Sequence, residues 1–215
     1  MATVLSTKKL SLSQKQLLLN SGIGLVEYNA IQIEFIDFKT DTQIFKNAII
    51  TSKNTVKAIL KKDLKIKNCF CVGEKTATYL QKNNFNIAEI ADYGDNLAQI
   101  IVEKYPNEQF TFFCGDERRD ELPSILKKNN VNFEEIEVYK TSLKPKQFKR
   151  KFDGILFFSP SGVKSFVSKN KLDKGIAFCI GSTTASEAKK HTNNIVIANK
   201  PSIENVIVQA IKYFK

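Results

Sequence analysis

The sequence contains a single histidine, His191, among its 215 residues. Nucleophilic sites of the Ser-His-Asp and Cys-His types use an imidazole as their base, so here they would depend on that one side chain. His191 directly follows Lys189 and Lys190 at the expected polar end of a helix, where we expect it to be solvated. Any chemistry of this chain is therefore expected to proceed without a histidine base.

Cysteine is also scarce, and its spacing does not suit a metal site. No Cys-x-x-Cys pair occurs in the chain. Each cysteine lies in an apolar segment shortly before a glycine-containing loop, which is typical of small buried core residues. We expect no bound metal and four core thiols, namely Cys69, Cys71, Cys114 and Cys179.

Long apolar runs are absent. No stretch approaches the roughly 18 residues that a membrane-spanning helix needs. Residues 1–11 carry two lysines without the apolar segment of a secretory signal, so we expect a cytoplasmic protein with no membrane partner. The chain also lacks the Gly-Lys-Ser/Thr of a P-loop and the Gly-x-Gly-x-x-Gly of a dinucleotide fold, so nucleotide binding is not indicated.

Positive charge, by contrast, is plentiful. The 33 lysines and arginines exceed the 22 acidic residues, and the net charge is +11. A basic surface serves nucleic acid, a polyanionic small molecule, or no ligand at all. The lysines are scattered along the sequence, mostly where helices are expected to end. They do not suggest a basic stripe interleaved with aromatic residues. We therefore expect no nucleic-acid partner.

The chain contains an internal repeat. Residues 49–56 (IITSKNTV) are similar to residues 156–163 (LFFSPSGV), and residues 71–77 (CVGEKTA) to residues 179–185 (CIGSTTA). Both pairs are separated by nearly the same offset, so a whole strand-helix-strand-helix unit is duplicated. Two α/β domains with matching loops at matching strand ends suggest one ligand in a cleft between them.

Short apolar segments alternate regularly with helical segments of about ten residues, which predicts an α/β fold with doubly wound parallel sheets of the flavodoxin or Rossmann kind. Strands are expected at residues 3–6, 25–38, 47–51, 68–72, 86–90, 109–114, 132–144, 154–159, 176–180 and 195–198. Helices are expected at residues 13–20 and 95–104, capped by Ser13 and Asp95, and at 53–62, 75–83, 118–129, 161–169, 183–191 and 202–215.

These elements predict two similar domains, one of them discontinuous. The second copy lacks a first strand and helix of its own, which the N-terminus can supply. We expect a discontinuous domain of residues 1–24 and 145–215 and an inserted domain of residues 39–131. Residues 25–38 and 132–144 would form a two-stranded β ladder as the hinge. No exposed apolar repeat calls for a partner chain, so we expect a monomer.

Loops between strands and helices carry hydroxyl residues in both copies. The first N–H groups of a helix lack partners and its dipole is positive there, so such loops suit anions. Ordinary helix capping is the alternative, because Ser and Thr are preferred caps, but the duplication favours a ligand. The residues are Ser52, Gly73, Thr76, Ser159, Ser161, Gly162, Gly181, Thr183 and Thr184.

A further loop runs from Gly115 to Arg119 after an apolar strand. Two arginines, Arg118 and Arg119, are unfavourable at the positive start of a helix, so something should offset them. The neighbouring acidic residues can do so locally, and an acidic ligand is the equally open alternative.

In their order along nearly the whole chain, these motifs resemble the uroporphyrinogen-III synthase family. The matching segments are ITS at 50–52, VGxxTA at 72–77, Gly115 with Arg118 and Arg119, VYKT at 138–141, FFSPSGV at 157–163, IGxTTA at 180–185 and KPS at 200–202. The resemblance implies two α/β domains joined by a two-stranded ladder. It also implies a cofactor-independent enzyme that cyclises hydroxymethylbilane, a linear tetrapyrrole with eight carboxylates, with inversion of ring D through a spiro intermediate and release of water.

The resemblance also implies roles for individual residues. Tyr139 matches the family tyrosine thought to assist loss of the terminal hydroxyl as a proton donor or hydrogen-bond partner. A strand tyrosine that only packs in the hinge is the alternative. The implied substrate-binding residues are Ser52, Gly73, Thr76, Gly115, Arg118, Ser159, Ser161, Gly162, Gly181, Thr183 and Thr184, acting partly through backbone N–H groups. Lys53 and Asn54 depart from the family pattern, which leaves the contacts of that loop open.

Two other classes of protein remain open. A two-domain binding or sensor protein for a polycarboxylate would use the same kind of cleft. The missing secretory signal and the VYKT segment argue against it. A nucleic-acid-binding protein is favoured only by the charge.

Overall fold

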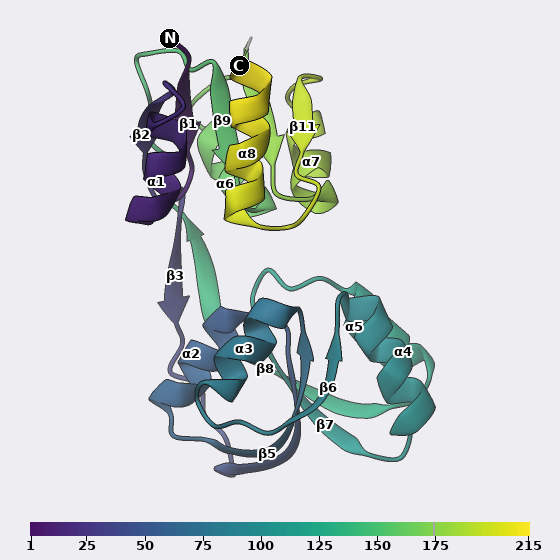
Figure 1. The fold of residues 1–215 in the computed structure, drawn as a ribbon. Helices are drawn as coiled ribbons and strands as arrows, with labels where there is room; N and C mark the ends of the chain where they lie inside the picture. The colour runs from purple at the N-terminus through teal and green to yellow at the C-terminus, as the bar shows by residue number, and fades with distance from the viewer. Residues whose placement is uncertain (174) are drawn as a thin grey trace. The chain divides into compact units, whose positions relative to one another are not determined.

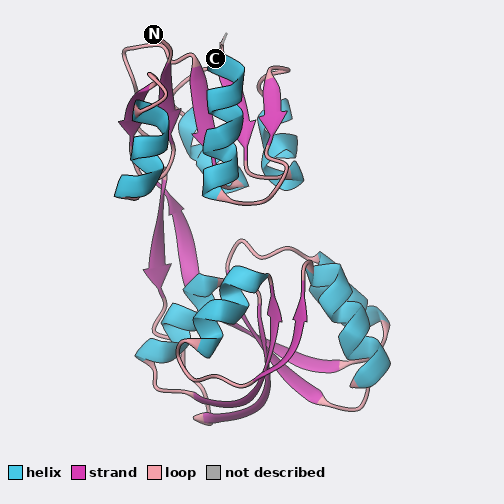
Figure 2. Ribbon diagram, viewed as in Figure 1, coloured by secondary structure: helices cyan, strands magenta, loops and turns pink. Residues whose placement is uncertain are grey.

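The computed structural model describes residues 1–173 and 175–215. These residues form two compact units, each with helices on a sheet whose strands pair mainly in parallel (Figures 1 and 2). Unit 1 comprises residues 1–32 and 142–215, and unit 2 comprises residues 33–141. The parallel α/β class predicted from the alternation of elements is confirmed.

Unit 1 is built on a five-stranded sheet in the order β11-β10-β9-β1-β2. Neighbouring residues on a strand point to opposite faces, so Val4 and Leu5 enter different core clusters. Helices α6 and α7 cover the face of Leu5, and α1 and α8 cover the face of Val4. The strands are β1 (Thr3–Ser6), β2 (Gly24–Glu27), β9 (Gly154–Phe157), β10 (Ile176–Cys179) and β11 (Ile195–Ile197), and the helices are α1 (Leu12–Leu19), α6 (Pro160–Val167), α7 (Ser182–Lys189) and α8 (Ile203–Phe214).

Unit 2 is built on a six-stranded sheet in the order β3-β8-β7-β4-β5-β6. Ile49 and Ile50 of the central strand enter different clusters, the first covered by α4 and α5 and the second by α2 and α3. The strands are β3 (Ile31–Phe35), β4 (Ile44–Ile50), β5 (Lys65–Val72), β6 (Ile87–Ala91), β7 (Gln109–Gly115) and β8 (Asn132–Leu143), and the helices are α2 (Lys53–Lys61), α3 (Glu74–Gln81), α4 (Gly94–Lys104) and α5 (Glu121–Lys128).

The two sheets place equivalent elements in the same order. From the central strand β4, unit 2 has β5 and β6 on one side and β7 and β8 on the other. From β9, unit 1 has β10 and β11 on one side and β1 and β2 on the other. The N-terminal β1-α1-β2 therefore takes the place that β7-α5-β8 takes in unit 2. In each sheet the chain order reverses beside the central strand, which is where α/β proteins bind ligands, at the carboxyl ends of the strands.

Residues 25–38, expected as one extended strand, form two strands in different sheets. β2 pairs in parallel with β1, whereas β3 lies beside β8 at the edge of the other sheet. The backbone beyond β2 stays bound to the first strand, because Tyr28 N–H donates to Ser6 O at 3.1 Å. Ala30 N–H likewise donates to Thr7 O at 2.9 Å. These bonds draw the first half of the segment into unit 1.

The expected caps of two helices and the expected start of a third are wrong. Helix α1 is capped by Ser11 and not by Ser13, because Ser11 and Gln14 form a reciprocal capping box. Helix α4 begins at Gly94, so Asp95 lies in its first turn. Helix α5 begins at Glu121 and not at residue 118, because its first backbone bond runs from Ser124 N–H to Asp120 O.

Candidate functional site

The carboxyl edge of the unit 2 sheet brings three predicted site residues together. Ser52 follows β4, Gly115 ends β7, and Tyr139 lies on β8 directly opposite Gly115. β4 and β7 are the neighbouring strands between which the chain order reverses. These three residues therefore occupy the position at which α/β sheets bind ligands.

Tyr139 reaches across the end of β7 to the loop after β4. Its hydroxyl lies near the side chain of Ser52. Ser52 also caps helix α2, because its Oγ accepts a hydrogen bond from Asn54 N–H at 3.1 Å. The phenol thus lies near the positive end of a helix, where negative charge is favoured.

Gly115 lies directly beneath the Tyr139 ring. A Cβ atom at this position would lie 2.4 Å from both Cε2 and Cζ of the tyrosine, which is far closer than carbon atoms approach without a bond. Any other residue at position 115 would displace the ring. Glycine is needed here for close approach of a side chain, which the sequence could not reveal.

A β-bulge turns Tyr139 toward this position. The register between β7 and β8 shifts after Cys114, so Cys114 pairs with Glu137 whereas Gly115 pairs with Tyr139. As a result Val138 and Tyr139, although adjacent, both pack against the core cluster beneath α2 and α3. Strict alternation would send them to opposite faces. Bulges next to active sites commonly re-aim a side chain in this way.

Asp116 fixes the backbone on both sides of the tyrosine. Its N–H donates to Tyr139 O at 3.2 Å, and its Oδ1 accepts from Thr141 N–H at 3.0 Å. The same oxygen accepts from Glu117 N–H at 2.9 Å. From the sequence, Asp116 is only one of the acidic residues that can offset Arg118 and Arg119. Its role in holding Tyr139 depends on a pairing between distant segments, so no local signal could have found it.

The phenol of Tyr139 is protonated at neutral pH. Its ring is half-buried, and burial raises the pKa of the group above 10.0, while the hydrogen bond from Ser52 partly opposes this shift. Nearby Cys114 and Asp116 raise the pKa further. The side chain can therefore act as a proton donor or a neutral hydrogen-bond donor, and not as a base.

Arg118, predicted to bind a ligand, is already engaged by two carboxylates. Its Nε donates to Glu135 and its guanidinium also pairs with Asp120. Lys127 Nζ lies 3.6 Å from the other oxygen of Glu135. The arginine charge is therefore offset locally, and a ligand carboxylate would have to displace one of these partners.

The second loop of unit 2 is open at its glycine. Gly73 has φ +83°, a left-handed conformation that favours glycine, and nothing lies within 4 Å of the place of its Cβ. Its carbonyl accepts from Thr76 N–H at 2.9 Å. Thr76 itself is buried, so the accessible part of this loop is mainly backbone.

Unit 1 presents a similar edge with fewer accessible side chains. Ser159 caps α6, and its Oγ accepts from Gly162 N–H at 3.0 Å. Gly181 is extended and open, before helix α7. Ser161, Gly162 and Thr184 are buried, and Thr183 is half-buried. Burial of these side chains favours backbone N–H groups as the ligands of any anion.

Sequence reasoning missed Thr7 in this edge. It follows β1, and its hydroxyl donates to Leu156 O at 2.7 Å. Its Oγ1 lies 3.5 Å from the place of a Cβ at Gly162, beside the reversal between β1 and β9. The signal was present, because Ser6 and Thr7 end an apolar strand just as Ser52 and Ser159 follow theirs.

The four cysteines are buried, as predicted for core residues. Burial raises the pKa of Cys69 and Cys179 to about 12 and that of Cys71 and Cys114 to about 11. These thiols stay protonated at neutral pH and are poor nucleophiles. Within the described residues, no cluster of His, Cys, Asp and Glu suits a metal ion.

Known proteins similar to this chain share one description. The model of a family described as uroporphyrinogen-III synthase HemD matches residues 13–207. The porphyrin biosynthesis protein HemD of Ruminiclostridium josui is 29% identical over 154 residues, which are 63% of this chain and 30% of that protein. The chain thus aligns with less than a third of the length of this curated relative.

Solved structures establish the likeness of the fold. The uroporphyrinogen-III synthetase of Helicobacter pylori matches with a TM-score of 0.75 at 20% identity, over 99% of this chain and 100% of that one. A mutant uroporphyrinogen III synthase of Thermus thermophilus matches with a TM-score of 0.66 at 12% identity, over 99% and 98% of the two chains. Among the helices of the described residues, none is long and apolar enough to cross a bilayer.

Proposed function

The chain belongs to the uroporphyrinogen-III synthase family, and on that premise we propose that it cyclises hydroxymethylbilane to uroporphyrinogen III. The observation that carries this proposal is the position of the Tyr139 phenol, set over Gly115 and near Ser52. A neutral hydroxyl donor held at a ligand-binding edge is the group that loss of a hydroxyl requires.

In the proposed reaction, Tyr139 donates a hydrogen bond or proton to the terminal hydroxyl of ring A. The C–O bond breaks, water leaves, and a cationic azafulvene remains. The substituted carbon of ring D attacks this cation to form a spiro intermediate, which fragments and closes again with ring D inverted, and a ring proton is lost. Because the substrate closes without inversion in water, the protein must mainly impose a geometry.

The loops at the carboxyl edges supply ligands for the carboxylates of the substrate. We assign this role to the N–H groups that follow Ser52, Gly73, Ser159 and Gly181, with the hydroxyl of the half-buried Thr183 beside them. Gly115 contributes by leaving room for the Tyr139 ring. Arg118 contributes by releasing one of its protein carboxylate partners and binding a carboxylate of the substrate instead. The net charge of +11 favours a substrate with eight carboxylates.

The same proposal extends to the setting of the protein. It acts in the cytoplasm as a monomer, uses no cofactor and binds no nucleic acid as part of its function. Its substrate is the linear tetrapyrrole.

The test generates hydroxymethylbilane in situ and separates the uroporphyrin isomers by chromatography after oxidation. Type III should predominate in proportion to the protein added, without metal or nucleotide. If a folded sample yields only type I, at the rate seen without protein, the cyclase function is wrong. A protein that binds polycarboxylates without catalysis then becomes the better account.

A further inference from the structure

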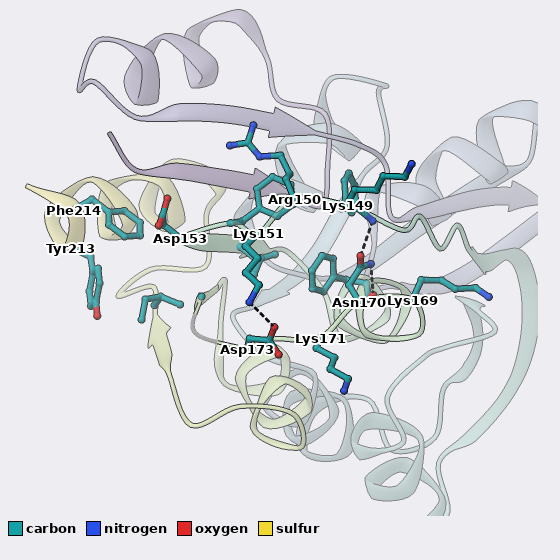
Figure 3. Close-up of a pocket in the computed structure, with 16 residues that line it drawn as sticks. Lys149, Arg150, Lys151, Asp153, Lys169, Asn170, Lys171, Asp173, Tyr213 and Phe214 are labelled. Carbon is teal, nitrogen blue, oxygen red and sulfur yellow. Dashed lines mark hydrogen bonds and ion pairs between the residues drawn. The ribbon is translucent and has the colours of Figure 1, made fainter.

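Unit 1 holds a pocket of about 610 Å³ at the amino ends of β9 and β10. This edge of the sheet is opposite to the loops that carry Ser159 and Gly181, which follow the carboxyl ends of the same strands. The wall is completed by residues 148–153, by the segment after α6, and by Tyr213 and Phe214 at the end of α8 (Figure 3). The pocket is therefore separate from the site proposed for the cyclisation.

The pocket combines a basic rim with an apolar interior. Among the residues that the structure describes, five cationic side chains line it, and all five are exposed: Lys149, Arg150, Lys151, Lys169 and Lys171. The two acidic residues among its lining already have partners. Asp153 Oδ2 accepts from Thr3 N–H at 2.7 Å, and Asp173 lies 3.8 Å from Lys151. The excess of positive charge is thus available to a ligand.

The helix dipole explains only part of this charge. Lys169 and Lys171 follow the end of α6, where cations are favoured whether or not a ligand binds. Lys149, Arg150 and Lys151 lie on an irregular segment without a helix end of its own. Placing three adjacent cations there raises their mutual repulsion, which a bound anion would relieve.

The basic segment is held in place by Asn170. The Oδ1 atom of this residue accepts from Phe148 N–H at 2.9 Å, and its Nδ2 donates to Lys146 O at 2.7 Å. Nδ2 also donates to Phe166 O at 2.9 Å, which ties the segment to α6 (Figure 3). A preorganised loop loses less entropy when it binds a ligand.

Sequence reasoning overlooked this segment. Residues 144–152 (KPKQFKRKF) do interleave basic and aromatic residues, so the expectation that no such stripe exists was wrong. In the structure, however, the aromatic rings are covered. Lys146 Nζ lies 5.5 Å from the centre of the Phe148 ring, and Arg150 Cζ lies 5.4 Å from that of Phe152. Rings covered in this way cannot stack on successive bases, so the segment is a poor single-strand groove.

We propose that this pocket binds a small aromatic polyanion of nucleotide size. Its volume falls in the range of about 300–1,000 Å³ that is usual for small-molecule sites. The negative groups pair with Lys149, Arg150 and Lys151 at the rim, and the flat ring enters the interior, whose lining includes Ile176 and Phe214. Recognition by side chains needs no glycine-rich phosphate loop, so the lack of such a motif does not oppose it.

The test is calorimetric titration of the intact chain with ATP and with inorganic tripolyphosphate, at about 0.15 M salt, where long-range attraction is screened. ATP should bind at least about tenfold more tightly than tripolyphosphate, because only ATP has a ring to bury. Equal affinity, or no binding of ATP at millimolar concentration, would overturn the proposal.

A charge-matched pair of variants locates the site. Replacing Lys149, Arg150 and Lys151 by alanine should weaken ATP binding at least about tenfold. The control replaces three exposed lysines of unit 2 by alanine, namely Lys57, Lys65 and Lys67, which removes the same charge. This variant should change the affinity for ATP by less than about twofold. Equal weakening in both would show bulk attraction and contradict the proposal. If the first variant does not fold, amide exchange in the wild type decides, since ATP must protect residues 146–153 and not unit 2.

Discussion

Tyr28 in unit 1 and Tyr139 in unit 2 belong to equivalent strand segments of the two sheets, but their surroundings differ. Tyr28 comes directly after β2, and Tyr139 lies on β8. β2 runs beside β1 in regular register, so Tyr28 stays on the same face as Val26, in the core covered by α6 and α7. β8 instead has a bulge beside Gly115, which brings Tyr139 to the ligand-binding edge. The same arrangement of strands therefore yields a structural tyrosine in one unit and a candidate catalytic one in the other.

The surroundings of the two phenols follow from this difference. Tyr28 is only 7% exposed, and burial raises its pKa to about 12. Its hydroxyl lies near that of Ser165, but within the described residues neither hydroxyl makes a hydrogen bond of good geometry. Tyr139 is half-buried and lies near Ser52. One local register shift and one glycine are what distinguish the two.

Gly115→Ala should have the largest effect on this comparison. The added Cβ would lie 2.4 Å from the Tyr139 ring and force it away from Ser52. Because a misplacement of about 1 Å can cost about a hundredfold in rate, we expect a loss of that order in type III formation. Gly94→Ala is the matched control in the same unit, since its Cβ would meet Leu122 at an ordinary 3.5 Å. Equal activity of the two variants would show that the tyrosine ring need not lie where it does.

Ser52→Ala and Ser159→Ala compare equivalent caps of the repeat. Each variant loses a capping bond worth about 1 kcal/mol, so thermal unfolding should shift similarly in both. Only Ser52 also lies beside the hydroxyl of Tyr139. We expect turnover to fall about tenfold for Ser52→Ala and less than about threefold for Ser159→Ala, in which the backbone donors remain. A complete loss of activity in a folded Ser159→Ala protein would contradict the assignment of backbone N–H groups in unit 1.

A smaller effect should appear in the alkaline stability of the chain. Between its unfolded pKa of 10.0 and its folded pKa of about 12, Tyr28 keeps its proton in the folded state and loses it in the unfolded state. The unfolded state binds fewer protons there, so stability falls as the pH rises through this window. Urea unfolding at about pH 9 and pH 11 should show a loss on the order of 1 kcal/mol greater for the wild type than for Tyr28→Phe. Equal losses would mean that Tyr28 is not buried in solution.

Much of the fold could be predicted because its signals are local. The alternation of apolar and helical segments, and the repeat of Ser52 in Ser159 and of Gly73 in Gly181, depend on neighbours within a few residues. The pairing of β2 with β1 could not be predicted, because the bonds of Tyr28 and Ala30 join segments that are about twenty residues apart in the chain.

The candidate site divides in the same way. The loop residues and Tyr139 could be predicted from motifs, whereas the bulge, the reason for Gly115 and the role of Asp116 could not. Each of the latter depends on how β7 pairs with β8, which a single strand does not specify. Arg118 is the clearest example. Its partner Glu135 lies on β8, and the local sequence around the arginine does not indicate that pairing.

The central claim is that the chemistry depends on Tyr139 and not on its counterpart Tyr28, and parallel assays of Tyr139→Phe and Tyr28→Phe test it most directly. Each variant removes one hydroxyl and leaves the ring. For Tyr139→Phe we predict a fall of about a hundredfold in type III formation with nearly unchanged thermal stability, as expected on losing a proton donor. Tyr28→Phe should retain wild-type turnover. Wild-type turnover in Tyr139→Phe, or an equal loss in both variants, would contradict the account.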